Sequence, residues 1–150
     1  MTSNLRSIAL AALVAVASLS QTLHAQSDLI HSQVTVPFSF DYGKAHFGQG
    51  TYVINMIDQN VLSIRTVEGK TTMVMAQLSF EPSAAKSSVV TFKKYGDRYF
   101  LEEVSIAGSD AHVSVYESQA EKHAARELAM RGQEATQVAL ALLPQHPFGN

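Results

Sequence analysis

Short runs in which apolar and polar residues alternate, separated by turns that contain glycine, cover the chain from Gln33 to Tyr116. A period of two is typical of a strand that buries one face. Pro37 has no N–H to offer a neighbouring strand, so we expect the first strand to lie at a sheet edge or to carry a bulge there. This strand covers Gln33 to Phe40, and its predicted buried side is Val34, Val36, Phe38 and Phe40.

A first β-hairpin is predicted around Glu68-Gly69, between runs that begin at Val61 and end at Phe80. A turn of two residues at that point sets the register of the two strands. This register places Leu62 opposite Met75 and Ile64 opposite Met73, with all four side chains on the buried face.

A second hairpin is predicted around Gly96-Asp97. A two-residue turn there places Phe92 opposite Leu101 and Val89 opposite Val104. Apolar side chains occupy both faces of this hairpin, so we expect both faces to be covered.

A helix is predicted to begin after Ser118, because Ser118 and Glu121 have the spacing of a capping box and strong helix formers follow. Gly132 is typical of a helix end, yet apolar residues continue at roughly helical spacing as far as Leu142. One long helix and two short ones are both open. The apolar run Val138–Leu143 is expected to be covered, with packing on its own domain favoured and self-association through this segment as the alternative.

These patterns predict a mainly β fold with a C-terminal α-helical segment. We expect an antiparallel sheet of six to seven strands, curled into a small barrel or a sandwich. The expected organisation is a β domain over 33–116, a helix or helix pair over 117–143 that packs on it, and a frayed tail over 144–150.

The first 25 residues have the three-part pattern of an export signal. Arg6 gives a positive start, Ile8 to Ala17 is an uninterrupted apolar run, and Ser18 to Ala25 is small and polar. We expect cleavage near Ala25, a flexible lead over 26–32, and a periplasmic or secreted location. The apolar run is much shorter than the roughly 20 residues of a membrane-spanning helix, so we do not expect a protein integral to a membrane.

The chain has no cysteine, which excludes disulfide bonds and a lipid attached through an N-terminal cysteine. The 11 basic and 13 acidic residues are interspersed, without a block of like charge. Nucleic acid binding needs a clustered basic surface, so nucleic acid is not an expected partner.

Three segments resemble a group of small, uncharacterised exported proteins of acidobacteria: Val36 to Phe40 (VPFSF), Gly48 to Tyr52 (GQGTY) and Phe92 to Leu101 (FKKYGDRYFL). Those proteins have a VPFxF strand, a leucine-proline-alanine-glycine turn before a tyrosine strand, and a YFL strand. This chain departs at the turn, where it has Phe47, Gly48 and Gln49. The resemblance implies a bacterial exported domain and carries no catalytic residue.

Ser83 and Lys86 have the spacing of penicillin-recognising serine enzymes. The companion motifs of those enzymes are missing, and a four-residue pattern recurs by chance. We therefore expect Ser83 to Lys86 to be a polar loop.

Glu102 and Glu103 are adjacent on a predicted strand and point to opposite faces. They cannot act together on one glycosidic bond, which needs two converging carboxylates. One of them is expected to pair with Lys93 or Lys94 across the hairpin.

Asp110 and His112 share one face of a predicted strand, and Glu117 is the best candidate for a third metal ligand. The histidines lack the spacings typical of metal sites on helices and strands, so no metal is expected. A hydrolase site assembled from distant residues would use Asp110, His112 and Glu103.

Gly48 and Gly50 lack the third glycine of a dinucleotide loop, because Val53 stands there and no helix follows, so no cofactor is expected. Aromatic residues suit sugar or lipid stacking, but core and hairpin positions are favoured for them. The residues concerned are Tyr42, Phe47, Tyr52, Tyr95, Tyr99 and Tyr116.

The sequence thus predicts no catalytic, cofactor-binding or metal-binding residue. The favoured function is a non-enzymatic envelope or secreted β module that binds a ligand or partner through a face or edge of its sheet. Two alternatives stay open: a small periplasmic hydrolase, and a homo-oligomeric envelope assembly subunit that associates through its edge strand or its C-terminal helix.

Overall fold

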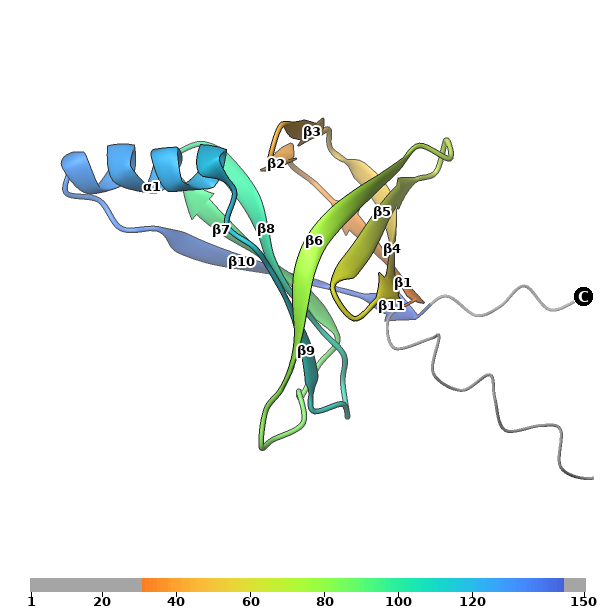
Figure 1. The fold of residues 1–150 in the computed structure, drawn as a ribbon. Helices are drawn as coiled ribbons and strands as arrows, with labels where there is room; N and C mark the ends of the chain where they lie inside the picture. The colour runs from red at the N-terminus through yellow and green to blue at the C-terminus, as the bar shows by residue number, and fades with distance from the viewer. Residues whose placement is uncertain (1–30, 145–150) are drawn as a thin grey trace, which may run out of the picture.

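In the computed structural model, which describes residues 31–144, eleven strands pair into one sheet and a helix packs beside it (Figure 1). The helix is α1 (Gln119–Met130), between β9 and β10. The expected mainly β fold with one C-terminal helical element is confirmed. The strands are β1 (His31–Val36), β2 (Phe40–Tyr42), β3 (Ala45–Phe47), β4 (Gly50–Asp58), β5 (Val61–Thr66), β6 (Thr71–Phe80), β7 (Val89–Tyr95), β8 (Arg98–Ser105), β9 (Ala111–Val115), β10 (Thr136–Ala141) and β11 (Leu143–Pro144).

Both ends of the sheet extend beyond the expected β domain. β1 begins at His31, so residues 31 and 32 are not part of a flexible lead, and β11 includes Pro144, which was expected in the frayed tail. The expected export signal, its cleavage point after Ala25 and the tail from 145 onward lie outside the described residues.

The strands follow the order β10-β7-β8-β9-β6-β5-β4-β1-β11, with the β2–β3 hairpin beside β8. The sheet is mixed, not purely antiparallel as expected, because β2 runs parallel to β8 where Asp41 lies opposite Phe100. β6 belongs to both halves of the sheet: it pairs with β5 up to Met75 and with β9 from Ala76 onward. Strands that change partners in this way form the corners of curled sheets.

The two ends of this order, β10 and β11, are neighbours in the sequence. Residues 136–141 pair with β7, and residues 143–144 pair with β1. Leu142 lies between them and is buried. One stretch of chain therefore reaches both edges of the sheet, but no continuous ladder closes the sheet into a barrel.

The loop between β5 and β6 has three residues, where the sequence predicted a turn of two. The Thr66 N–H donates to the Lys70 carbonyl, which leaves residues 67–69 as the loop, and Gly69 has a φ of 92°. A three-residue loop that ends in a left-handed glycine is a common hairpin connection.

This loop makes the predicted register of the first hairpin wrong by one residue. Leu62 lies opposite Val74 instead of Met75, and a shift of one residue exchanges the two faces of a strand. Val74 and Ala76 are 0% exposed, whereas Met73 and Met75 are 57% and 53% exposed.

The second hairpin follows its predicted register near the turn, where Phe92 lies opposite Leu101. A bulge between Thr91 and Phe92 then shifts the pairing, so that Val90, not Val89, lies opposite Val104. Phe92 and Leu101 lie in the main core on the inner face. The prediction that both faces are covered holds only near the turn, where Tyr95 and Phe100 lie under α1, because the outer face beyond them carries the partly exposed Lys93, Glu102 and Glu103.

The predicted first strand is broken at its proline. β1 ends at Val36, directly before Pro37, and β2 begins at Phe40, because proline has neither the φ freedom nor the N–H of a continuing strand. Beyond the break, the Tyr42 hydroxyl accepts a hydrogen bond from the Met75 N–H at 2.9 Å and lies 3.3 Å from the Met75 carbonyl. The Tyr42 side chain of β2 thus binds backbone groups of β6 that a neighbouring strand would otherwise bind, at the point where β6 changes partners.

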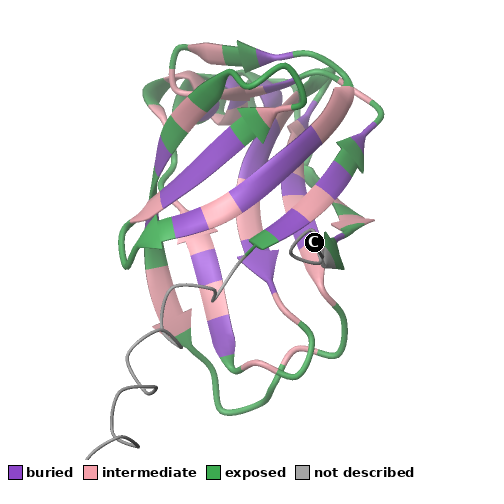
Figure 2. Ribbon diagram, turned by 90° about the vertical axis from the view of Figure 1, so that its right-hand side faces the viewer, coloured by how far each residue is buried: buried purple, intermediate pink, exposed green. Residues whose placement is uncertain are grey.

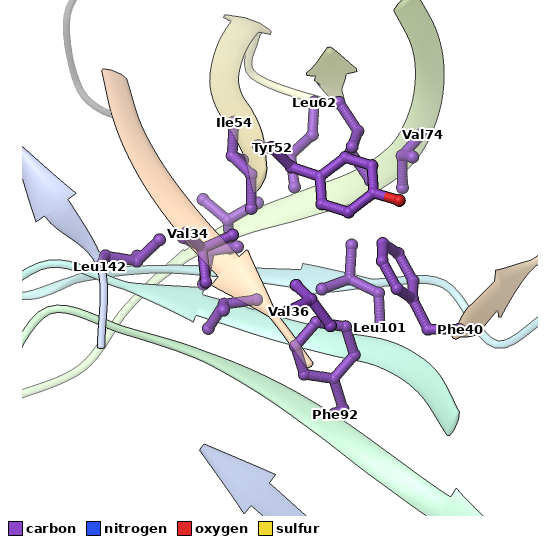
Figure 3. Packing of buried hydrophobic residues seen from close by; sticks show 14 of the residues in the cluster. Val34, Val36, Phe40, Tyr52, Ile54, Leu62, Val74, Phe92, Leu101 and Leu142 are labelled. Carbon is purple, nitrogen blue, oxygen red and sulfur yellow. The ribbon is translucent and has the colours of Figure 1, made fainter. Parts of the chain in front are cut away.

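The core lies inside the curled sheet, and buried and exposed residues alternate along the strands around it (Figure 2). Figure 3 shows side chains from both halves of the sheet converging, including Val34, Leu62 and Phe92. Phe40 stacks on Phe47 with ring centroids 4.7 Å apart, so the β2–β3 hairpin adds aromatic side chains to this core. Burying a side chain of this size stabilises a fold by about 1.5 to 3 kcal/mol.

The helix begins as predicted: the Glu121 N–H donates to Ser118 Oγ at 3.1 Å. It ends earlier than predicted, at Met130, where Gly132 is left-handed and the Gln133 N–H donates to the Leu128 carbonyl. This is a Schellman motif.

The expectation of a helix or helix pair up to residue 143 is wrong, because residues 136–141 form β10. The apolar residues that suggested helical spacing also fit a period of two. Val138 and Leu140 are half-buried, Leu142 is buried, and the residues between them are exposed.

The register of β6 predicts opposite responses at two adjacent positions. Val74→Asp should destabilise the protein by several kcal/mol, roughly 3 or more, because it places a carboxylate in the core. Met73→Asp should change the free energy of unfolding by less than about 1 kcal/mol, because this side chain is in solvent. Denaturant unfolding of both variants checks this, and equal losses would contradict the register.

Candidate functional site

The structure separates most of the residues that the sequence offered for catalysis or metal binding. Ser83 and Lys86 are exposed in the β6–β7 loop, as expected for a polar loop. Glu102 and Glu103 both lie on the outer face of β8, not on opposite faces as predicted, because the bulge beside Thr91 leaves Leu101 and Val104 both in the core. Glu102 lies 3.2 Å from the Lys93 ammonium, as predicted, and Glu103 lies 3.2 Å from His112. Glu117 lies 3.8 Å from Lys93 and not beside His112, so the suggested metal ligands do not assemble.

Two carboxylates flank the imidazole of His112 on the outer face of β8 and β9. Nδ1 of His112 lies 3.2 Å from Oε1 of Glu103, and Nε2 lies 3.8 Å from Oε2 of Glu81. The imidazole is 12% exposed. Sequence analysis named Glu103 and His112 but missed Glu81, whose N–H donates to the Asp110 carbonyl in the ladder that extends β6 and β9.

This cluster has the carboxylate–imidazole pair that is typical of a general base. Its imidazole, however, is not placed to accept a proton from a substrate. A general base needs a free nitrogen within hydrogen-bond distance of the group that it deprotonates. Nε2 of His112 is buried and faces a carboxylate, and Ser79 Oγ is directed to the His112 carbonyl, not to the ring. The contacts instead connect β6, β8 and β9. Among residues 31–144, no group of three or more acidic, histidine or cysteine side chains is arranged to hold a metal ion.

A second cluster lies between α1 and the β7–β8 hairpin. Glu121 and Tyr95 are 5% and 9% exposed, and the Tyr95 hydroxyl donates to Oε1 of Glu121 at 3.3 Å. Burial and the negative charge of Glu117 raise the pKa of Glu121. Burial and Glu121 raise the pKa of Tyr95 to about 12. The capping box indicated the helical position of Glu121, but only the fold brings Tyr95 to it.

The Tyr95–Glu121 pair fixes the helix on the sheet. Phe100, Ala124 and Leu128 pack around it, and Ser118 binds the Glu121 carboxylate through its backbone N–H. Shallow grooves of about 350 and 200 Å³ flank the nearby hairpin turn at Gly96. Their walls carry charges of both signs, including Lys94 and Glu134, so neither favours one ligand charge.

An exposed apolar surface, here called the Met/Tyr patch, consists of Met73, Met75 and Tyr116. The three residues are 57%, 53% and 50% exposed. Met73 and Met75 share the outer face of β6, and the Tyr116 N–H donates to the Met75 carbonyl at 3.3 Å. Large contiguous apolar surfaces are typical of interaction sites, and methionine adapts well to different partner surfaces.

The row of paired residues next to the patch contains an unpaired polar atom. Asn55 of β4 lies opposite Ser63, which lies opposite Met73. Asn55 Oδ1 is buried and has no hydrogen-bond partner within residues 31–144. Such an acceptor is normally satisfied by protein or by water.

Of the aromatic residues considered for ligand stacking, most have structural positions. Phe47 and Tyr52 are buried in the main core, and Tyr95 lies under α1. Tyr99 stacks on Phe38 with ring centroids 3.9 Å apart. Tyr116 is the exception and belongs to the Met/Tyr patch.

Comparison of the chain with protein-family models, with curated proteins and with solved structures finds no match. In the described part of the chain, no helix has the length and apolar character needed to cross a membrane.

The buried carboxyl predicts a pH-dependent stability. A carboxyl whose pKa is raised by folding stabilises the protein below its ordinary value of 4.5, and this contribution is lost as pH rises through the folded-state pKa. Glu121→Gln keeps the acceptor for Tyr95 without a charge, so it should raise the unfolding midpoint at pH 7, and this gain should vanish in acid. Glu134→Gln, at an exposed position, is the control. Parallel pH profiles for wild type and Glu121→Gln would contradict the assignment.

Proposed function

We propose that this protein is a non-enzymatic, exported β module that binds the apolar side chains of a partner protein through its Met/Tyr patch. The observation that carries this proposal is the exposure of Met73 and Met75 on β6, whose opposite face supplies the core residues Val74 and Ala76. Within residues 31–144 neither methionine side chain belongs to a hydrophobic core cluster, and their exposed apolar surface is what the proposed partner would contact.

The chemistry of the patch favours a protein partner. Two thioethers and a tyrosine ring offer polarizable apolar area with few hydrogen-bonding groups, whereas sugar binding needs several donors and acceptors around a ring.

The curled sheet serves as a rigid support for this surface in the proposal. The antiparallel pairs of most strands, together with the segment 136–144 that reaches both sheet edges, favour a barrel-like scaffold over two separate layers. The hydrolase alternative is less well supported, because the nitrogen of His112 that a substrate would need is buried against Glu81.

Site-specific photo-crosslinking in the producing cell tests the proposed surface. A photoreactive residue at Met75 should give a discrete crosslinked protein, and the same residue at Lys122, which is exposed on α1, should not. Met73→Glu should weaken binding of the crosslinked partner by at least about tenfold, equivalent to about 1.4 kcal/mol. Gln77→Glu, on the same face of β6, is the matched charge control. A crosslink pattern that does not depend on the position would contradict the proposal.

Export is part of the same proposal and follows from the pattern of the first 25 residues and from the resemblance to exported acidobacterial proteins. Protein recovered from the cell envelope or the medium should begin at Gln26. N-terminal sequencing checks this, and an intact Met1 on material from the cytoplasm would contradict it.

A further inference from the structure

β10 presents a backbone edge toward the side away from β7. The Leu142 N–H donates to the Ser88 carbonyl at 2.9 Å. From Ala141 back to Thr136, β10 pairs with β7 without a register shift. In an antiparallel ladder, residues whose N–H and C=O face the partner strand alternate with residues whose groups face away. Thr136, Val138 and Leu140 therefore bond to β7, whereas the backbone groups of Gln137 and Ala139 point outward.

This edge lacks the features that normally protect edge strands. Natural sheet edges carry charges, prolines or bulges that prevent pairing with another chain. β10 (TQVALA) has no charge and no proline, and within residues 31–144 it pairs with β7 alone. Figure 1 shows it at the margin of the sheet, beside β7.

The side chains of β10 suit a second copy of the same strand. In an antiparallel pair centred on Val138, Gln137 lies opposite Ala139 of the other copy, and both have outward backbone groups, so four hydrogen bonds form. Val138 then lies opposite Val138, which extends the half-buried apolar face of the strand. No like charges meet, because the strand carries none.

We propose that two copies of this chain pair through β10 and form an antiparallel dimer that joins their sheets. This interface is separate from the Met/Tyr patch, because β7, β8 and β9 lie between β10 and β6. The run Val138–Leu143, which the sequence suggested for self-association through a helix, takes this role as a strand.

Light scattering of the purified protein tests the dimer. The wild type should have twice the monomer mass. Ala139→Pro removes an outward N–H without removing a bond to β7, so it should give the monomer mass with an unchanged melting temperature. Ala139→Lys places a charge on the edge strand and should also give a monomer. It tests the same interface if the proline variant folds poorly.

Two control variants assign the interface. Thr91→Lys places the same charge opposite Ala139 but one strand inside the edge, so this variant should remain a dimer. Met75→Glu should also remain a dimer, since the Met/Tyr patch is elsewhere. A monomeric wild type, a dimeric Ala139→Pro variant or a monomeric Met75→Glu variant would each overturn the proposal.

Discussion

Gly69 closes the three-residue loop between β5 and β6 with a φ of 92°, a conformation that side-chain-bearing residues rarely adopt. The loop length determines which face of β6 turns inward, because a strand exchanges its faces when its register moves by one residue. β6 pairs with β5 on one half of the sheet and with β9 on the other. The length of this one loop therefore determines which β6 side chains enter both halves of the core.

The same choice produces the exposed surface on which the proposed function depends. β6 has apolar residues on both faces, Val74 and Ala76 on one and Met73 and Met75 on the other. The smaller side chains fill the interior, where each is 0% exposed, and the flexible methionines remain outside. A core with the methionines inside would have to accommodate more volume, and interiors tolerate added volume poorly.

The sequence predicted features that depend on local patterns: the alternating strands, the Gly96-Asp97 turn and the capping box at Ser118. It did not predict features that depend on one residue of loop length or on tertiary contacts. The methionine register was wrong because Glu68-Gly69 fits turns of two or three residues. Val138 to Leu142 fits both a helix and a strand, and pairing with β7 decided between them. The Glu81 contact with His112 and the Tyr95 contact with Glu121 join residues distant in sequence, which a pattern along the chain does not reveal.

The pairing of β5 with β6 can be measured with engineered disulfides, because the chain contains no cysteine that would compete. A disulfide requires Cα atoms about 4.4 to 6.8 Å apart and side chains on the same face. Ser63 lies opposite Met73, whereas Ile64 would face Met73 only if the loop had two residues. The three-residue loop predicts that the Ser63→Cys/Met73→Cys variant forms a disulfide within one chain and that the Ile64→Cys/Met73→Cys variant does not. Efficient crosslinking of the second pair with failure of the first would contradict the register of β6 and the exposure of the Met/Tyr patch.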